Sequence, residues 1–275
     1  MKFSTNQVLM AAVAGSFLVT GSAASAEGSR SIVVGPQVVA KPKYEGSDEH
    51  DVYVIPLFIP KFSDSADENP SLFKKFRRRL DFRGLDDVRI RISRPGGFEF
   101  GVATGYISDR DQSDARRLRG LGDVDGGLLL GGYAGIRRGP VLFDAAVVDK
   151  VTGDDAGFQF RFGAETERQI SPRTKVKARI GTTFADDDYM QTYFGVTPGQ
   201  SARSSAGLRA FNASGGIKDI HVQLGTEIEL TERWLVKATG QYARLLGDAA
   251  DSPVIETEDQ FSGTLGFGYR FYLSR

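Results

Sequence analysis

The residues best equipped for chemistry gather in one short stretch, Ser47 to Asp51, which reads SDEHD. His50 stands between Glu49 and Asp51, so a serine nucleophile, a histidine base and a carboxylate can be assembled on paper. A catalytic triad joins residues from separate segments, because adjacent loop residues rarely converge on one reacting atom. We therefore interpret the stretch as a solvated loop and expect no catalytic residue in it.

Three further features are candidates for binding or catalysis. Asp186 to Asp188 offers carboxylates to calcium, but it lacks the glycine and glutamate of a calcium loop, which favours a solvated loop entrance. The basic aromatic cluster FKKFRRR, Phe73 to Arg79, suits anionic lipid headgroups, murein or a membrane edge. The other histidine, His221, is expected to face a barrel lumen. We expect no metal, no cofactor and no enzyme.

Composition narrows the class of protein. The chain has 275 residues, of which 40% are hydrophobic, and its 35 basic and 35 acidic residues cancel. This balance argues against a disordered chain and against nucleic acid as a partner. The absence of cysteine excludes disulfides and thiolate metal sites. The 33 glycines and 19 phenylalanines, spread along the chain, are typical of sheets with tight turns.

The N-terminal segment predicts export. Lys2 precedes an apolar run, Val8 to Val19, and Ala24 to Ala26 has the A-x-A pattern of a cleavage site. We predict a cleaved secretory signal peptide at residues 1–26 and a single domain at residues 27–275. No later stretch reaches the roughly 18 apolar residues of a membrane helix, so the mature chain is either soluble or a β-barrel.

Period-two patterning favours the barrel. Phe158, Phe160 and Phe162 alternate with polar residues, and the same alternation of apolar and polar side chains recurs in residues 175–184, 220–230, 234–245 and 261–271. These runs reach ten to thirteen residues, whereas strands of soluble sheets average about five or six and membrane strands need about nine to eleven. The alternative is a large soluble β-sandwich or a lipocalin-like barrel.

The lengths of the connections also indicate an outer-membrane barrel. Short turns at residues 137–140, 171–174 and 231–233 alternate with long polar loops at residues 109–126, 186–216 and 247–260. Aromatic residues near strand ends predict interfacial girdles. These residues are Tyr106, Trp234, Tyr242, Phe261 and Tyr269.

Counting strands from the C-terminus gives twelve, with ten as the alternative. The expected early strands are Ile32–Ala40, Val52–Lys61, Phe76–Gly84 and Val88–Ser93. The predicted fold class is all-β, a transmembrane antiparallel up-and-down β-barrel. Pro56 removes a ladder donor from the second strand, which predicts a bulge or a locally unpaired spot there. Because that strand is apolar on both faces, its inner residues are expected to pack in the lumen, against the segment Tyr193–Ser204.

The lumenal face carries charges of both signs. Tight turns place Glu165 opposite Arg179, Glu167 opposite Lys177, and Glu227 opposite Lys237. Opposite charges directly across two strands contribute roughly 0.2–1 kcal/mol each. A strongly ion-selective pore would show rings of one sign, so we interpret these pairs as the filling of a narrow barrel.

Three segments resemble the MipA/OmpV family of outer-membrane proteins, named after the MltA-interacting protein. PKYEGSDEHDVYVIP at 42–56 resembles the signature near the start of the family, YFGVTPGQSARS at 193–204 a conserved loop, and RLLGDAADSPV at 244–254 the segment before the last strand. The motif residues are Pro42, Tyr44, Gly46, Ser47, Pro56, Tyr193, Phe194, Gly195, Val196, Thr197, Gly247, Asp248, Ser252 and Pro253.

The resemblance implies an outer-membrane barrel of a Gram-negative bacterium, in contact with lipid and lipopolysaccharide. It also implies a scaffold that links a murein-degrading lytic transglycosylase to a bifunctional murein synthase. Other members are described as porin-like proteins or adhesins, so a channel or an adhesin with long extracellular loops is the alternative. This chain departs from the family in its basic segment Phe73–Arg79 and in the residues Tyr272–Arg275, which follow the aromatic Phe271.

Overall fold

The computed structural model describes residues 30–61, 80–84, 86–153 and 157–273. They form one antiparallel sheet of twelve strands, as predicted. The strands are β1 (Arg30–Pro42), β2 (His50–Lys61), β3 (Leu80–Phe82), β4 (Val88–Ser93), β5 (Phe98–Ile107), β6 (Gly127–Arg138), β7 (Val141–Lys150), β8 (Phe158–Ser171), β9 (Thr174–Ala185), β10 (Gly216–Glu229), β11 (Trp234–Leu245) and β12 (Asp259–Leu273).

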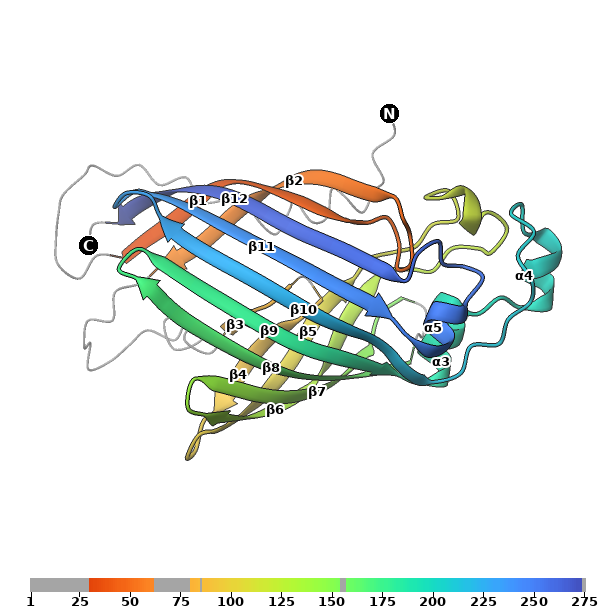
Figure 1. Ribbon diagram of the computed structural model, residues 1–275, viewed down its shortest axis with the longest axis horizontal. Coiled ribbons are helices and arrows are strands. Elements are labelled where there is room, and N and C mark those ends of the chain that lie inside the picture. Colours follow the sequence, from red (N-terminus) through yellow and green to blue (C-terminus); the bar gives the residue numbers. More distant parts are fainter. Residues whose placement is uncertain (1–29, 62–79, 85, 154–156, 274–275) are drawn as a thin grey trace.

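The sheet has an up-and-down topology and curves into a barrel (Figure 1). Its strand order is β2-β1-β12-β11-β10-β9-β8-β7-β6-β5-β4-β3, so β1 pairs with both the second strand and the last. Among the described residues, β2 and β3 do not pair with each other. The predicted signal peptide and the basic segment Phe73–Arg79 lie outside the described residues.

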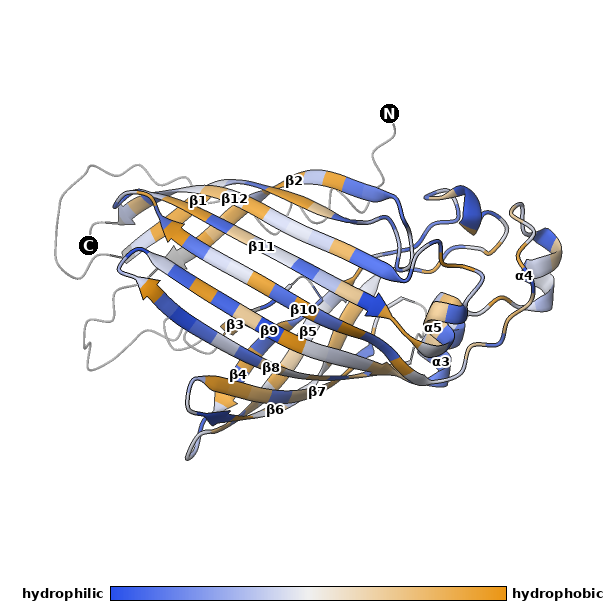
Figure 2. Cartoon of the chain, in the orientation of Figure 1, coloured by the Kyte–Doolittle hydropathy of each residue, from blue (hydrophilic) through white to orange (hydrophobic). Residues whose placement is uncertain are grey.

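The strands are apolar outside and polar inside. On β8, Phe158, Phe160 and Phe162 are 48%, 39% and 47% exposed, whereas Gln159 and Arg161 between them are 3% and 9% exposed. Figure 2 shows apolar and polar residues alternating along the strands. Water-soluble proteins bury such apolar side chains and expose charged ones, so this outer face is built for lipid. The soluble alternatives are therefore wrong.

Aromatic side chains cluster on the outer face near both ends of the barrel. At the short-turn end Trp234 stacks on Phe267 with ring centroids 4.7 Å apart, and at the other end Tyr242 lies 5.1 Å from Phe261. Phe261 and Phe271 on β12 are ten residues apart, about 33 Å along the strand. A tilt of about 40° reduces this span to roughly 25 Å, the height of the apolar band of outer-membrane barrels.

The connections differ at the two ends. Turns of a few residues join β6 to β7, β8 to β9 and β10 to β11, whereas long loops at the other end carry short helices (Figure 1). The helices are η1 (Arg116–Leu118), α3 (Asp187–Phe194), α4 (Pro198–Arg203) and α5 (Gly247–Asp251). None of these helices has the length and apolarity to cross a membrane. The loops predicted as merely polar are therefore folded structures.

Pro56 forms no bulge and lies instead at a locally unpaired spot, the second of the two outcomes predicted for it. The β1–β2 register runs without a shift, and Pro56 lies directly opposite Pro36. Two facing prolines can only form a non-hydrogen-bonded pair, so their ring nitrogens point away from each other. The ladder interruption lies instead between β1 and β12, whose register passes from Val34 to Gln37. Pro56 directs its nitrogen to the outer edge of β2, which no strand of the described residues pairs with.

The inner face of β2 packs on strands, not on the segment Tyr193–Ser204 as expected. Leu57 forms a buried cluster with Val33 of β1 and Leu235 of β11. Gly268 of β12 makes the space for this cluster, because a Cβ at that position would lie 2.4 Å from Val33. The inner face of β2 is thus packed against side chains of neighbouring strands in the lumen, near the short-turn end.

Of the predicted third strand, Phe76–Gly84, residues 76–79 lie outside the described residues, and β3, Leu80–Phe82, pairs with β4. Its neighbour Arg83 places a guanidinium nitrogen 3.1 Å from Asp144 Oδ1 on β7, and Asp81 Oδ1 lies 3.4 Å from Lys177 Nζ on β9. These partners stand far from β3 in the strand order, so the segment 80–84 turns into the lumen. Pairing with lumenal carboxylates explains this path, because an arginine on the lipid face would be left unpaired.

Candidate functional site

The three family-like segments meet in one structure at the long-loop end, which we call the cap. The cap comprises residues 43–49, 108–126, 186–215 and 246–258, and its helices lie beyond the ends of the strands (Figure 1). Its apolar core joins side chains from all four loops. They are Tyr44, Ala115, Leu118, Leu121, Val196, Leu208 and Val254. Because the loops start from strands on opposite sides of the barrel, the cap spans its mouth.

Hydrogen bonds at Gly46 join the first segment to the end of the third segment and to the residues that follow it. The carbonyl of Gly46 accepts hydrogen bonds from the backbone N–H groups of Glu256 and Thr257 at 2.7 and 3.1 Å. Gly46 has a φ of +98°, and a Cβ there would lie 2.3 Å from Ile255. Tyr44 adds a hydrogen bond from its hydroxyl to the carbonyl of Val254 at 3.2 Å. Only glycine satisfies both the backbone conformation and the close packing.

The first segment also bonds to β10 and to α3. Glu45 forms an ion pair with Lys218 of β10 and accepts a hydrogen bond from the Tyr189 hydroxyl at 3.2 Å. Ser47 lies 3.4 Å from the carboxylate of Glu256 and is buried. These contacts join the first segment to β10, to α3 and to the loop between β11 and β12.

The second segment contains α3 and the start of α4. Asp186 caps α3 by accepting a hydrogen bond from the Tyr189 N–H at 2.9 Å, which gives this carboxylate a structural role. At the other end of α3, Ser252 donates a hydrogen bond to the carbonyl of Phe194 at 2.5 Å. Thr197 forms a capping box with Gln200 at the start of α4. Gly195 follows α3, and Val196 pairs with Phe211 across an isolated bridge.

The third segment closes the cap from the side of β11 and β12. Gly247, with a φ of +53°, begins α5, and Asp248 accepts a hydrogen bond from the N–H of Ser214 at 2.7 Å. Pro253 accepts one from Arg117 Nε at 2.9 Å through its carbonyl. The remaining motif residues, Pro42 and Pro56, lie in β1 and β2.

Arg110 is a buried cation at the centre of the cap. It donates hydrogen bonds to the carbonyls of Tyr193 at 2.7 Å and Thr192 at 3.3 Å, at the C-terminal end of α3. Carbonyls at a helix C-terminus carry partial negative charge and suit a guanidinium. Burial lowers the pKa of Arg110, although nearby tyrosines and Glu45 oppose this effect. Arg110 therefore ties the loop after β5 to the second family-like segment.

Two buried phenols make the cap sensitive to alkali. Burial, reinforced by Glu256, raises the pKa of Tyr44, and burial together with Glu45 raises the pKa of Tyr189 well above its ordinary value. A phenol whose pKa is raised in the folded state stabilises the fold fully at pH values below the pKa of the unfolded chain, about 10. This contribution is lost as the pH rises from about 10 through the pKa of the folded state. We expect the cap to loosen above about pH 10.

Phenolate absorbance during an alkaline titration tests this expectation. Tyr44→Phe and Tyr189→Phe should each remove amplitude from the late part of the titration, above the pH at which exposed tyrosines ionise. Free tyrosine titrated in the same buffer, with a pKa of about 10, marks the early part of the curve. Loss of early amplitude from Tyr44→Phe would show that its phenol is not held in the cap.

Below the cap, the lumen is crossed by a buried ionic cluster centred on Asp144. Its carboxylate lies 2.6 Å from Arg179 and 3.1 Å from both Arg83 and Arg89. The Asp144 side chain is fully buried, and the three arginine side chains are at most 6% exposed. The three guanidiniums come from β9, the segment after β3, and β4, so the cluster bridges the two sides of the barrel.

The predicted charge pairs stand opposite each other in the register, as Glu165 with Arg179, Glu167 with Lys177, and Glu227 with Lys237. Some of these side chains form their ion pairs with residues other than the one directly opposite. Lys177 Nζ lies 3.1 Å from Glu165 Oε1, while Glu167 is 3.3 Å from Lys175. Lys177 Nζ also lies 3.4 Å from Asp81 Oδ1 in the lumen, which accounts for its position away from Glu167.

The sequence interpretation missed Asp144, Arg83, Arg89 and Arg110. One signal was present, because Asp144 interrupts the apolar run VLFDAAVV, and an ionisable residue within a membrane strand indicates a lumenal partner. The identity of its partners was not readable, since two of them come from the irregular region before and within β4.

The two histidines lie apart. His50 was predicted in a loop but is the first residue of β2, because the pairing of β2 with β1 extends to Pro42. Its Nε2 lies 2.9 Å from the carbonyl of Phe261. His221 faces the lumen, with Nδ1 2.9 Å from Asp219. In the described ranges no group of three or more His, Asp or Glu side chains could hold a metal ion.

Comparison with known proteins agrees with this geometry. A sequence model of the family described as "MltA-interacting protein MipA" matches residues 34–271, which include all three cap segments. The outer membrane proteins Omp26La of Vibrio anguillarum and OmpV of Vibrio cholerae are each 29% identical over 93 residues, 33% of this chain and 34% of theirs. The putative outer membrane protein YiaT of Escherichia coli is 25% identical over 99 residues, 36% of this chain and 39% of its own.

These matches span little more than a third of each relative. Among solved structures, OprB of Pseudomonas putida covers 89% of this chain and 94% of its own at a TM-score of 0.37 and 8% identity. The anion-selective porin from Comamonas acidovorans gives a TM-score of 0.30 at 10% identity, over 89% of this chain and 98% of its own. Structural similarity at these TM-scores adds no evidence about the fold, which the strand pairing already defines. The family match and the relatives identify this chain as an outer-membrane barrel protein of the MltA-interacting protein MipA family.

Proposed function

We propose that this protein is a non-enzymatic scaffold that docks a murein-degrading lytic transglycosylase at the short-turn face of the barrel and brings a bifunctional murein synthase to it. The observation that carries the proposal is membership of a family described by its interaction with MltA. Short turns face the periplasm in outer-membrane barrels, and murein lies on that side of the membrane. The scaffold is therefore assigned to the face opposite the cap.

The charge of the short-turn face supports docking. Arg138, Arg168 and Arg173 lie at or near these turns and are exposed, and none forms an ion pair within the part of the chain that the structure describes. Exposed guanidiniums without partners favour an acidic surface on the docked protein, because complementary charge steers association.

Two features weigh against the porin-like alternative. The cap spans the long-loop mouth with an apolar core, and the Asp144 cluster bridges the lumen below it. A conducting barrel needs a continuous water-filled path, as in porins. Two separate layers of contacts across the lumen oppose such a path and leave the outer faces as the working surfaces.

Retention of purified enzymes on the immobilised, full-length barrel tests the scaffold. We expect a lytic transglycosylase to be retained more strongly than on an unrelated barrel of similar size. Arg173→Glu should weaken retention severalfold, whereas Arg209→Glu, an equally exposed change on the cap, should not. Equal retention on the unrelated barrel would refute the scaffold, and loss with Arg209→Glu alone would place docking on the other face.

A further inference from the structure

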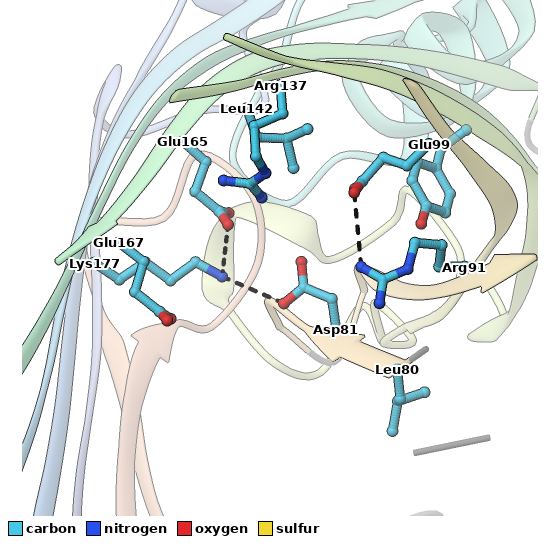
Figure 3. A pocket seen from close by; sticks show the side chains of 10 residues that line it. Leu80, Asp81, Arg91, Glu99, Arg137, Leu142, Glu165, Glu167 and Lys177 are labelled. Carbon is cyan, nitrogen blue, oxygen red and sulfur yellow. Dashed lines mark hydrogen bonds and ion pairs between the residues drawn. The ribbon is translucent and has the colours of Figure 1, made fainter. Parts of the chain in front are cut away.

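A cavity of about 310 Å³ lies in the lumen at the short-turn end. Glu99, Arg137 and Glu167, which line it, stand within a few residues of turns at that end. Figure 3 shows charged side chains from both sides of the barrel pointing into it. The remaining lining residues are Leu80, Asp81, Arg91, Tyr133, Leu142, Glu165 and Lys177.

The carboxylates of Glu99 and Glu165 line one part of the cavity. Glu99 Oε2 lies 2.9 Å from Arg94, and Glu165 Oε2 lies 3.3 Å from Arg83, yet neither oxygen receives a hydrogen bond among the described residues. Both side chains are nine-tenths buried. Carboxylates that line a cavity accept hydrogen bonds from an ammonium group, which has three donors.

Another part offers a cation. Arg137 lines the cavity, whereas its neighbour Arg138 occupies the alternate, outward position of β6. The guanidinium of Arg137 has no acidic partner in the described ranges, although Glu165 and Glu99 share its cavity. A planar guanidinium binds a carboxylate through two parallel hydrogen bonds. The cavity therefore presents hydrogen-bond donors for a carboxylate beside acceptors for an ammonium group.

From this arrangement we propose that the pocket binds a small zwitterion, an amino acid or short peptide with a free ammonium and a free carboxylate. Its volume is at the lower end for ligand sites, which suits a dipeptide better than a sugar chain. The ammonium would bond Glu99 or Glu165, and the carboxylate would bond Arg137. Binding of the zwitterion needs no docked protein, so the test of the pocket is independent of the test of the scaffold.

Calorimetric titration of the full-length protein in detergent with alanyl-alanine tests the pocket. We expect binding with a dissociation constant of roughly 1 mM, as suits so small a ligand. N-acetyl-alanyl-alanine lacks the ammonium and alanyl-alanine amide lacks the carboxylate, and each should bind at least about tenfold more weakly. The two blocked peptides thus test the two halves of the site separately.

Variants locate the binding. Arg137→Gln and Glu99→Gln should each weaken the dipeptide about tenfold, while Arg138→Gln, the adjacent outward residue, should bind like the unaltered protein. Melting temperatures of the three variants show whether they fold alike. The proposal is overturned if alanyl-alanine does not bind at 10 mM, roughly ten times the expected constant. Equal binding of the blocked peptides, or equal effects of Arg137→Gln and Arg138→Gln, would also overturn it.

Discussion

Replacing Asp144 with Ala is expected to destabilise the barrel by about 3–5 kcal/mol, the cost of leaving buried charges without their partner. The change removes the carboxylate that lies within 3.1 Å of Arg83, Arg89 and Arg179, all nearly fully buried. Arg179 would lose both of its hydrogen bonds to Asp144, whereas Arg89 would keep Asp87 and Arg83 would keep Asp81. Urea unfolding in detergent, followed by heat-modifiable migration on gels, measures the loss.

Two variants show whether charge is the cause. Asp144→Asn keeps the shape of the side chain and should cost nearly as much as Asp144→Ala, because the negative charge is gone in both. Glu167→Gln removes a half-exposed carboxylate paired with Lys175 and should change stability by less than about 1 kcal/mol. If Asp144→Ala also costs less than about 1 kcal/mol, the cluster does not hold the two sides of the barrel together.

Substitution of Gly46 by Ala is expected to open the cap while the barrel stays folded. The left-handed backbone at this residue costs an L-amino acid about 1–2 kcal/mol, and the new methyl group would meet Ile255 at 2.3 Å. Relief of this contact requires residues 255–257 to move, which breaks the two backbone hydrogen bonds to Gly46. Hydrogen exchange of the amides of Glu256 and Thr257 should accelerate at least tenfold.

Gly207→Ala is the matched control. Gly207 also lies in the cap and has a φ of +68°, but a Cβ there meets no atom within 4 Å. It carries the backbone strain without the collision, so its effect on Glu256 and Thr257 should be small. Equal acceleration in the two variants would mean that strain alone, and not contact between the first and third segments, governs the cap.

The barrel wall was predictable from the sequence because each face of a strand meets one medium. Phe158, Phe160 and Phe162 face lipid, and the polar residues between them face the lumen, so alternation alone marks the strand and its length. The strand number was predicted from the parity of upward and downward strands between short turns and long loops, and the predicted bounds Val88–Ser93 are those of β4. The longer pairing of β1 with β2, which takes in His50, depends on the partner strand and was missed.

The cap was predictable only as three motifs. Their residue types mark turns and helix starts, as with Gly46, Thr197 and Gly247, but the contacts that unite them join positions about 60 to 210 residues apart. No periodicity encodes which loop meets which. The same limit applies to Asp144, whose presence in a strand was visible while its three partners were not.

We propose that the cap and the Asp144 cluster together close the barrel interior to the flow of ions. Single-channel recording of the purified protein in planar bilayers at neutral pH tests this claim most directly. We predict no stable unitary conductance for the unaltered protein and transient openings for Gly46→Ala combined with Asp144→Asn. A steady, defined unitary step from the unaltered protein would contradict the claim and favour a channel.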